Sequence, residues 1–221
     1  MTLYYDNAAE SGYKTGLSTY AWNHAVLYPR YPGLIVGVSL FASGSVSSIT
    51  ATVSGQPVRP FVYVREDHSG LYRSEIWCLT TAFDDLTDPF TASITLTLSG
   101  SITSMGCSAS YAYFGGIGFH AGVAGGGAEA SLVLASTADR SILFGNLTTS
   151  FTGTITEPGG QVSRYADSGA LGSIRGSDTP VIPLATAEDD LTFTDMGGLD
   201  TFALSVVELL SLAPLPPRIL G

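Results

Sequence analysis

The feature that most constrains the fold of this chain is a hydrophobic period of two. Apolar and polar side chains alternate along residues 17–26 and 46–53, and residues 34–41 form a short, mainly apolar run. Each segment is bounded by Gly, Pro or Ser, which is the pattern of β-strands. The sequence therefore predicts strands in all three places.

The same pattern continues to the end of the chain. Further strands are predicted at residues 58–65, 72–80, 91–98, 101–114, 129–135, 141–147, 150–156, 161–166, 190–194 and 199–210. They follow one another at about 8–12 residues, the spacing of β-sandwiches and barrels. Residues 205–210 could open a helix, but their β-branched content favours a closing strand. We therefore predict an all-β fold: an antiparallel, two-sheet jelly-roll β-sandwich.

Two segments interrupt the alternation. Residues 115–127 are rich in glycine, which predicts a loop inserted between strands, and residues 212–221 are rich in proline and apolar side chains, which predicts an extended C-terminal arm. The length of 221 residues fits one large all-β domain. We expect a single jelly-roll domain over residues 1–211, followed by the arm over 212–221.

Charge and hydropathy exclude two classes of partner. Acidic residues number 19 against 9 basic ones, giving a net charge of −10, whereas a nucleic-acid surface needs clustered Lys and Arg. Only 13% of the residues are charged, against about 25% in average domains. The longest apolar runs, 34–38 and 203–210, are nevertheless far shorter than the roughly 18 residues of a membrane-spanning helix. We expect neither nucleic acid nor membrane as a partner.

Cysteine usage and the N-terminus agree with synthesis in the cytoplasm. Residues 1–6 lack the basic start and apolar stretch of a signal peptide, so we expect no export by the ordinary route. Cys78 and Cys107 lie in apolar strands without the spacing of a zinc or redox site. We interpret both as buried free thiols, with a disulfide across the sandwich as the alternative.

The sequence predicts no catalytic residue and no cofactor. Glu75 shares a strand face with Arg73 and Trp77, but the second carboxyl that a glycosidase needs is missing. We interpret these residues as an Arg–Glu pair beside a packed Trp. Residues 116–121 match a loose G-x-G-x-x-A, but more glycine and then a strand follow, where a dinucleotide fingerprint would open a helix.

No metal site is predicted either. His24, His68 and His120 lie in different segments, without the paired spacing of zinc ligands or of a nucleophile and its base. Acidic clusters at residues 84–88 and 188–190 are interpreted as solvated turns. Calcium binding at these clusters remains the alternative.

Carbohydrate is the main alternative partner, because lectin-like sandwiches stack sugars on exposed aromatic rings. Tyr28 and Tyr31 lie in a proline-rich turn and could form such a glycan platform. Trp22 and Trp77 lie in the middle of strands, where core packing is expected instead.

Nearly the whole chain resembles a broad family of jelly-roll β-sandwich domains found in phage virion proteins and bacterial surface proteins. The matching segments, in order, are residues 4–9, 18–26, 33–39, 73–79, 91–100, 161–165 and 203–209. They mark strands of a fold and no chemistry, so the resemblance implies architecture. Residues 115–127 and the stretch after Leu212 have no counterpart in it, which makes them candidates for contacts particular to this chain.

From these observations we expect a non-enzymatic virion structural protein. The most specific form is a phage capsid decoration (cement) protein; a tail or fibre component or a carbohydrate-binding adhesin module is the alternative. Expected partners are copies of the chain itself, with a trimer as the form considered, and a major capsid or other virion protein. The expected intersubunit contacts are Phe119, Pro214, Leu215, Pro216, Pro217, Ile219 and Leu220.

Overall fold

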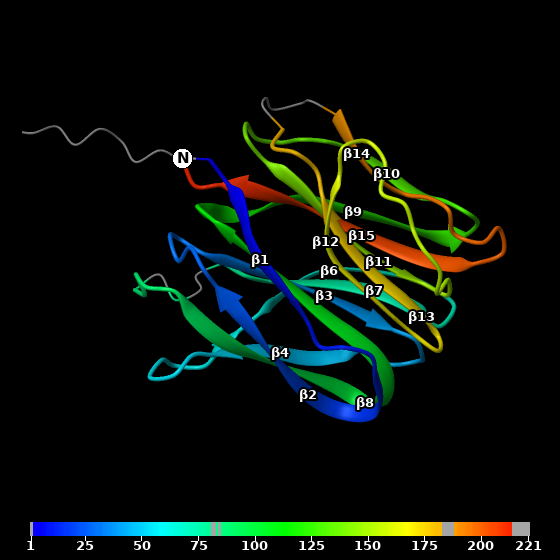
Figure 1. The fold of residues 1–221 in the computed structure, drawn as a ribbon, viewed down its shortest axis with the longest axis horizontal. Coiled ribbons are helices and arrows are strands. Elements are labelled where there is room, and N and C mark those ends of the chain that lie inside the picture. The colour runs from blue at the N-terminus through cyan, green and yellow to red at the C-terminus, as the bar shows by residue number, and fades with distance from the viewer. Residues whose placement is uncertain (1, 81–82, 84, 183–187, 214–221) are drawn as a thin grey trace, which may run out of the picture.

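The computed structural model describes residues 2–80, 83, 85–182 and 188–213, and every regular element in them is a β-strand (Figure 1). The strands are β1 (Tyr4–Glu10), β2 (Lys14–Val26), β3 (Gly33–Leu40), β4 (Val46–Thr52), β5 (Arg59–Pro60), β6 (Val62–Ser69), β7 (Tyr72–Leu79), β8 (Phe90–Ala112), β9 (Phe114–Gly126), β10 (Ala130–Ala135), β11 (Ile142–Thr149), β12 (Val162–Gly169), β13 (Gly172–Asp178), β14 (Glu188–Phe193) and β15 (Thr201–Ser211). The paired strands are antiparallel, which confirms an all-β antiparallel fold. No helix suited to crossing a membrane occurs in this described part.

One long strand, β8, organises the largest sheet, in which the strand order is β5-β4-β8-β3-β7-β6. Its first half pairs with β2 and β4, and its second half pairs with β1 and β3. The two halves face each other, because Trp22, which is paired with Ile94 in the first half, packs directly on Gly106 in the second. The sheet thereby curls into a nearly closed, barrel-like form.

The described strands stack in four layers, which Figure 1 shows from bottom to top. The curled sheet supplies the first two: β5, β4, β2 and the start of β8 below, and β1, β3, β7, β6 and the end of β8 above. The five-stranded sheet β12-β13-β11-β15-β9 forms the third, and the β10-β14 pair the fourth. The described strands thus form three sheets, where two were predicted.

Each gap between layers is filled by an apolar core, so the middle strands are buried on both faces. In β3, Leu34 and Val36 enter the first core while Ile35 enters the second. In β11, Phe144 enters the second core and Leu143 the third. Every residue of β3 and β11 is buried, which explains why their sequences read as apolar runs and not as an alternation.

The glycine-rich segment is a strand, so the loop predicted at residues 115–127 is wrong. Phe114–Gly126 forms β9 and pairs with β15 along the edge of the third layer. The glycines reflect close packing: a Cβ at Gly118 would lie 2.3 Å from Glu208 Oε2, and one at Gly122 would lie 1.8 Å from Asp67 Oδ2. Glycine here makes room for neighbouring side chains.

Strand β13 was not predicted, strand β1 was indicated only by the matching segment at residues 4–9, and the strand predicted at residues 150–156 does not form. In that segment, side chains hold the main chain in an irregular path: Thr149 Oγ1 accepts from the amide of Phe151 (3.1 Å), and Ser150 Oγ donates to Asp200 (2.8 Å). Leu212 and Ala213 follow β15 without regular structure. The predicted arm contacts from Pro214 to Leu220 lie outside the described residues.

The packing of the second layer on the third predicts a large cost for a methyl group at Gly37. A Cβ there would lie 2.1 Å from the hydroxyl of Tyr165 and 2.4 Å from Asn146 Oδ1, breaking the bond between them. We expect Gly37→Ala to lower the free energy of unfolding by about 2–4 kcal/mol, measured by chemical denaturation. Gly100→Ala is the matched control, since a Cβ at Gly100 meets no atom within 4 Å. Equal losses in the two variants would contradict this account.

Candidate functional site: an apolar groove between two edge strands

Two strands on the same side of the stack end their sheets. Strand β6 closes the curled sheet beyond β7, and β9 closes the five-stranded sheet beyond β15. Each therefore keeps one edge of main-chain donors and acceptors outside the ladder of its own sheet. The two strands lie against each other across the gap between the second and third layers. Any opening between them leads into the core that these layers share.

Such an opening exists, as a groove of about 460 Å³. It is lined by Val62, Tyr63, Val64, Cys78, Thr80, Ile117, Gly118 and His120. Cys78 is buried and belongs to the core between the second and third layers, and Val64 and Ile117 pack against that core. The groove is thus the place where this core opens to solvent.

The rim of the groove carries exposed apolar side chains. Val62 is 64% exposed and Tyr63 45%, and Phe119 of the neighbouring β9 is 49% exposed but is not among the lining residues. The ring of Tyr63 packs edge-on against Trp77, with the centroids 5.4 Å apart. Phe119, which the sequence predicts to be a contact residue, lies in β9 between the groove-lining Gly118 and His120.

A buried carboxylate fixes the main chain at Phe119. Glu208 of β15 is buried, and its oxygens accept hydrogen bonds from the amides of Phe119 (3.1 Å) and Thr137 (2.8 Å) and from the hydroxyls of Ser136 (2.9 Å) and Thr137. Burial alone would raise the pKa of the Glu208 carboxyl, but these bonds outweigh it and lower that pKa. Glu208 therefore stays ionised at neutral pH and holds this part of the rim in place.

The predicted glycan platform divides into two places on the loop between β2 and β3. The ring of Tyr28, 55% exposed, packs edge-on against Tyr4, which in turn packs against Tyr113. Tyr31 lines a shallow pocket of about 230 Å³ with Pro29, Arg30, Leu86 and Thr87. The sequence did not indicate the partners Tyr4 and Tyr113, because strand pairing brings them to the loop from distant positions.

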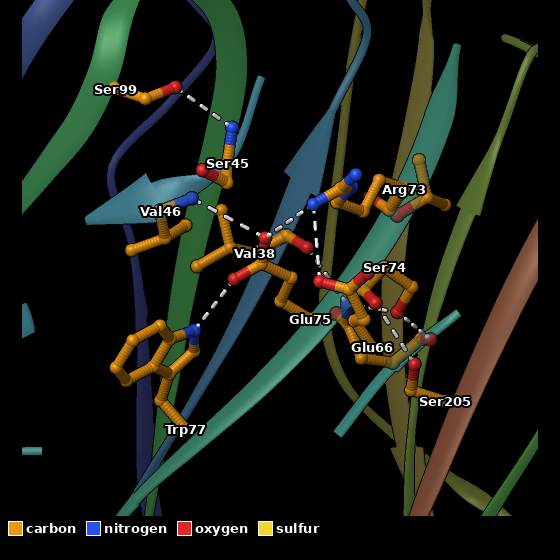
Figure 2. A network of polar contacts seen from close by, with 12 residues as sticks. Val38, Ser45, Val46, Glu66, Arg73, Ser74, Glu75, Trp77, Ser99 and Ser205 are labelled. Atoms are coloured by element: carbon orange, nitrogen blue, oxygen red, sulfur yellow. Dashed lines mark hydrogen bonds and ion pairs between the residues drawn. The ribbon is translucent and has the colours of Figure 1, made fainter. Parts of the chain in front are cut away.

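Glu75 lies inside the molecule and not at a surface cleft (Figure 2). Its carboxylate accepts a hydrogen bond from Trp77 Nε1 (2.9 Å) and another from the amide of Val46 (3.4 Å), and it lies 3.7 Å from the guanidinium of Arg73. Burial raises the pKa of Glu75, although the bonds from Trp77 and Val46 oppose this. The predicted Arg–Glu pair beside a packed Trp is confirmed, as is the core packing of Trp22 and Trp77.

His24 takes part in a buried polar chain that the sequence analysis missed. Ser110 donates to Asp6 Oδ2 (2.8 Å) and so accepts from His24 Nε2 (2.9 Å), which leaves Nδ1 to accept from Ser108 (2.8 Å). Trp22 Nε1 also donates to Ser108 (3.0 Å). The sequence does contain a sign of this chain of bonds: Trp22 and His24 are two residues apart on one strand, as Ser108 and Ser110 are on another. Only knowledge of how the strands pair could have shown that these residues meet.

Metal ligands are not gathered in the described part of the chain, which holds no group of three or more His, Cys, Asp or Glu suited to an ion. Residues 188–190 begin strand β14 and do not form the predicted turn, while Asp84 lies outside the described residues. Cys78 and Cys107 are free and buried, as predicted, and burial raises the pKa of both thiols. These thiols are protonated and suited to packing.

Comparison of the chain with family models, with curated protein sequences and with solved structures gave no match. The groove and the tyrosine loop must therefore be interpreted from their own geometry.

The His24 chain predicts a loss of stability in acid. Burial lowers the pKa of His24 from 6.5 to about 4, so between these values the unfolded chain binds a proton that the folded protein does not. Its contribution to stability is complete above pH 6.5 and falls as the pH drops to 4, by roughly 3 kcal/mol. Denaturation at pH 7 and pH 4 should show this loss in the parent chain relative to His24→Asn. Parallel pH profiles of the two proteins would refute it.

Proposed function

We propose that this chain is a non-enzymatic structural protein that works by assembling with copies of itself. The observation that carries the proposal is the composition of β9. Phe114–Gly126 contains no Lys, Arg, Asp, Glu or Pro, although it is an edge strand beside an apolar groove. Proteins that stay single protect such edges with charges, prolines or bulges, because a bare edge pairs with other chains. Of these protections β9 has only the two register shifts in its pairing with β15.

Two other edge strands differ from β9 in carrying charges, whereas β10, an edge of the two-stranded sheet, also lacks Lys, Arg, Asp, Glu and Pro. Strand β12 at the opposite end of the third layer carries Arg164 and Asp167, and β6 carries Arg65, Glu66 and Asp67. Charged side chains are thus present on these two edges, although Asp67 and Arg164 are mostly buried, and their absence from β9 leaves its edge without this protection. With a net charge of −10 on every copy, apolar and main-chain contacts must provide the attraction between copies.

The specific form of the proposal is a component of a phage particle. The resemblance to jelly-roll domains of phage virion proteins supports it, and sheets packed face to face are compatible with a jelly-roll arrangement. We propose a capsid decoration protein that binds its own copies, with a trimer as the form considered, and a major capsid protein. A tail or fibre component is the nearest alternative, and the expected location is the virion after synthesis in the host cytoplasm.

Self-association should be measured as mass in solution by light scattering during gel filtration. We expect a multiple of the 23.0 kDa chain mass. The double variant Val62→Lys/Phe119→Lys should weaken the association by about tenfold or more, because it places two charges in an apolar contact. Leu171→Lys, at a similarly exposed site in the turn between β12 and β13, should leave the mass unchanged.

Two results would count against the proposal. A parent chain of 23.0 kDa at all concentrations would refute self-assembly. Native protein that purifies free of any larger particle would refute the virion location while leaving self-assembly standing.

A carbohydrate-binding module is the second candidate, supported by the exposed ring of Tyr28 beside Tyr4. The amides of Leu27 and Tyr28 donate to Asp6 (3.0 and 3.2 Å), so the loop is held in place, as a stacking platform requires. On a glycan array, binding by the parent chain that is lost in Tyr28→Ala and retained in Leu171→Ala would establish this function. An array without hits would discard it.

A further inference from the structure

We propose that the C-terminal stretch from Leu212 onward in one copy lies along the free edge of β9 in a second copy, with Leu215 and Ile219 entering the apolar groove between β6 and β9. This rests on the proposed self-assembly and names the surfaces that carry it. The groove supplies the apolar side, and the sequence of residues 212–221 supplies an occupant of matching chemistry.

The stretch leaves the fold at the end of β9 itself. Ser211, the last residue of β15, pairs with Phe114, the first residue of β9, and the amide of Leu212 donates to the carbonyl of Tyr113 (2.8 Å). The groove begins only three residues further along β9, at Ile117. Two copies that meet on their β6/β9 sides would therefore place each C-terminal stretch near the partner's groove.

The direction of the chain favours the partner's groove over its own. Strand β15 runs antiparallel to β9 and moves away from the groove toward Phe114. To enter its own groove, the chain would have to reverse within a few residues after Ser211. Ala213 and Leu215 each precede a proline, which favours extended backbone at both positions and hence a path that continues outward.

Two of the three prolines suit a strand added at an edge. Successive residues of a strand turn their main-chain groups to opposite sides, so when Ala213, Leu215 and Ile219 face β9, Pro214 and Pro216 face away, whereas Pro217 faces β9 and leaves one ladder bond unmade. Proline has no amide hydrogen, and an outward position is where an edge strand tolerates it. In the same register the side chains of Leu215 and Ile219 share one face, which we assign to the groove.

The charge of the stretch is compatible with this partner. Arg218 is the one charged side chain in residues 212–221, and it would meet a copy whose net charge is −10. A second copy of this chain is thus the occupant that the apolar lining, the bare edge and the charge favour together.

The test uses disulfide capture between two full-length variants. His120→Cys places a thiol at an exposed position in the groove lining, and Ile219→Cys places one in the C-terminal stretch of the other chain. The two are mixed, one bearing an affinity tag, and oxidised with glutathione. The buried Cys78 and Cys107 are present in both, and the unsubstituted chain shows their background. The control replaces His120→Cys by Leu171→Cys, a similarly exposed site away from the groove.

We expect the mixed cross-link from His120→Cys to exceed that of the control by roughly tenfold, because docking raises the local thiol concentration. Peptide mass spectrometry should identify the bond between positions 120 and 219. Leu215→Asp/Ile219→Asp in the unsubstituted background should abolish self-association while the circular-dichroism melt stays unchanged.

Each other outcome overturns the inference in a distinguishable way. Self-association without a cross-link above the control would reject this docking while the proposed function stands. A bond formed within one chain of the double variant His120→Cys/Ile219→Cys, at the expense of bonds between chains, would assign the stretch to its own groove. A parent chain that never associates would reject the proposed assembly and this inference together.

Discussion

Burial of the two middle layers on both faces is the constraint on which the rest of the structure depends. A strand covered on both sides has no solvent-exposed face for polar side chains, so each buried polar group needs a hydrogen-bond partner within the protein. Asn146 meets this demand at the centre: its Nδ2 donates to Ser74 (2.7 Å) and to the carbonyl of Val38 (3.3 Å), and its Oδ1 accepts from Tyr165 (2.9 Å). Because this network links four strands of two sheets, β3 and β7 with β11 and β12, it fixes how the layers align.

With both faces covered, the middle layers meet solvent mainly at their edges, and the two sides of the stack differ. On one side, Glu10 accepts from the amide of Ala166 (2.9 Å), and the guanidinium of Arg164 lies 3.8 Å above the ring of Tyr5. These contacts join β1 to β12 across the layers. On the other side β6 and β9 leave the groove between them. The asymmetry makes the β6/β9 side the natural place for a partner.

Sequence periodicity was sufficient for the all-β class because alternation and turn residues act locally. It was insufficient for β9, since two of its glycines, Gly118 and Gly122, make room for Glu208 and Asp67, which reach the strand from other parts of the chain. The number of layers could not be predicted from the sequence either, because the apolar run at β3 is the same in a two-layer and in a four-layer stack. The sequence singled out Phe119 as a contact residue, and that remains a prediction; the groove beside it depends on β6, which only the pairing of strands brings near.

The glycines of β9 bear on function as well as on packing. A glycine within a strand costs roughly 0.5–1 kcal/mol relative to alanine, so a strand with this many is weak by itself. The hydrogen bonds of Glu208 offset part of that cost on the inner edge, where β15 pairs with it. On the outer edge the described structure supplies no such compensation. A partner strand would add main-chain bonds there at the least-protected segment of the third layer, so assembly and stability would be coupled through β9.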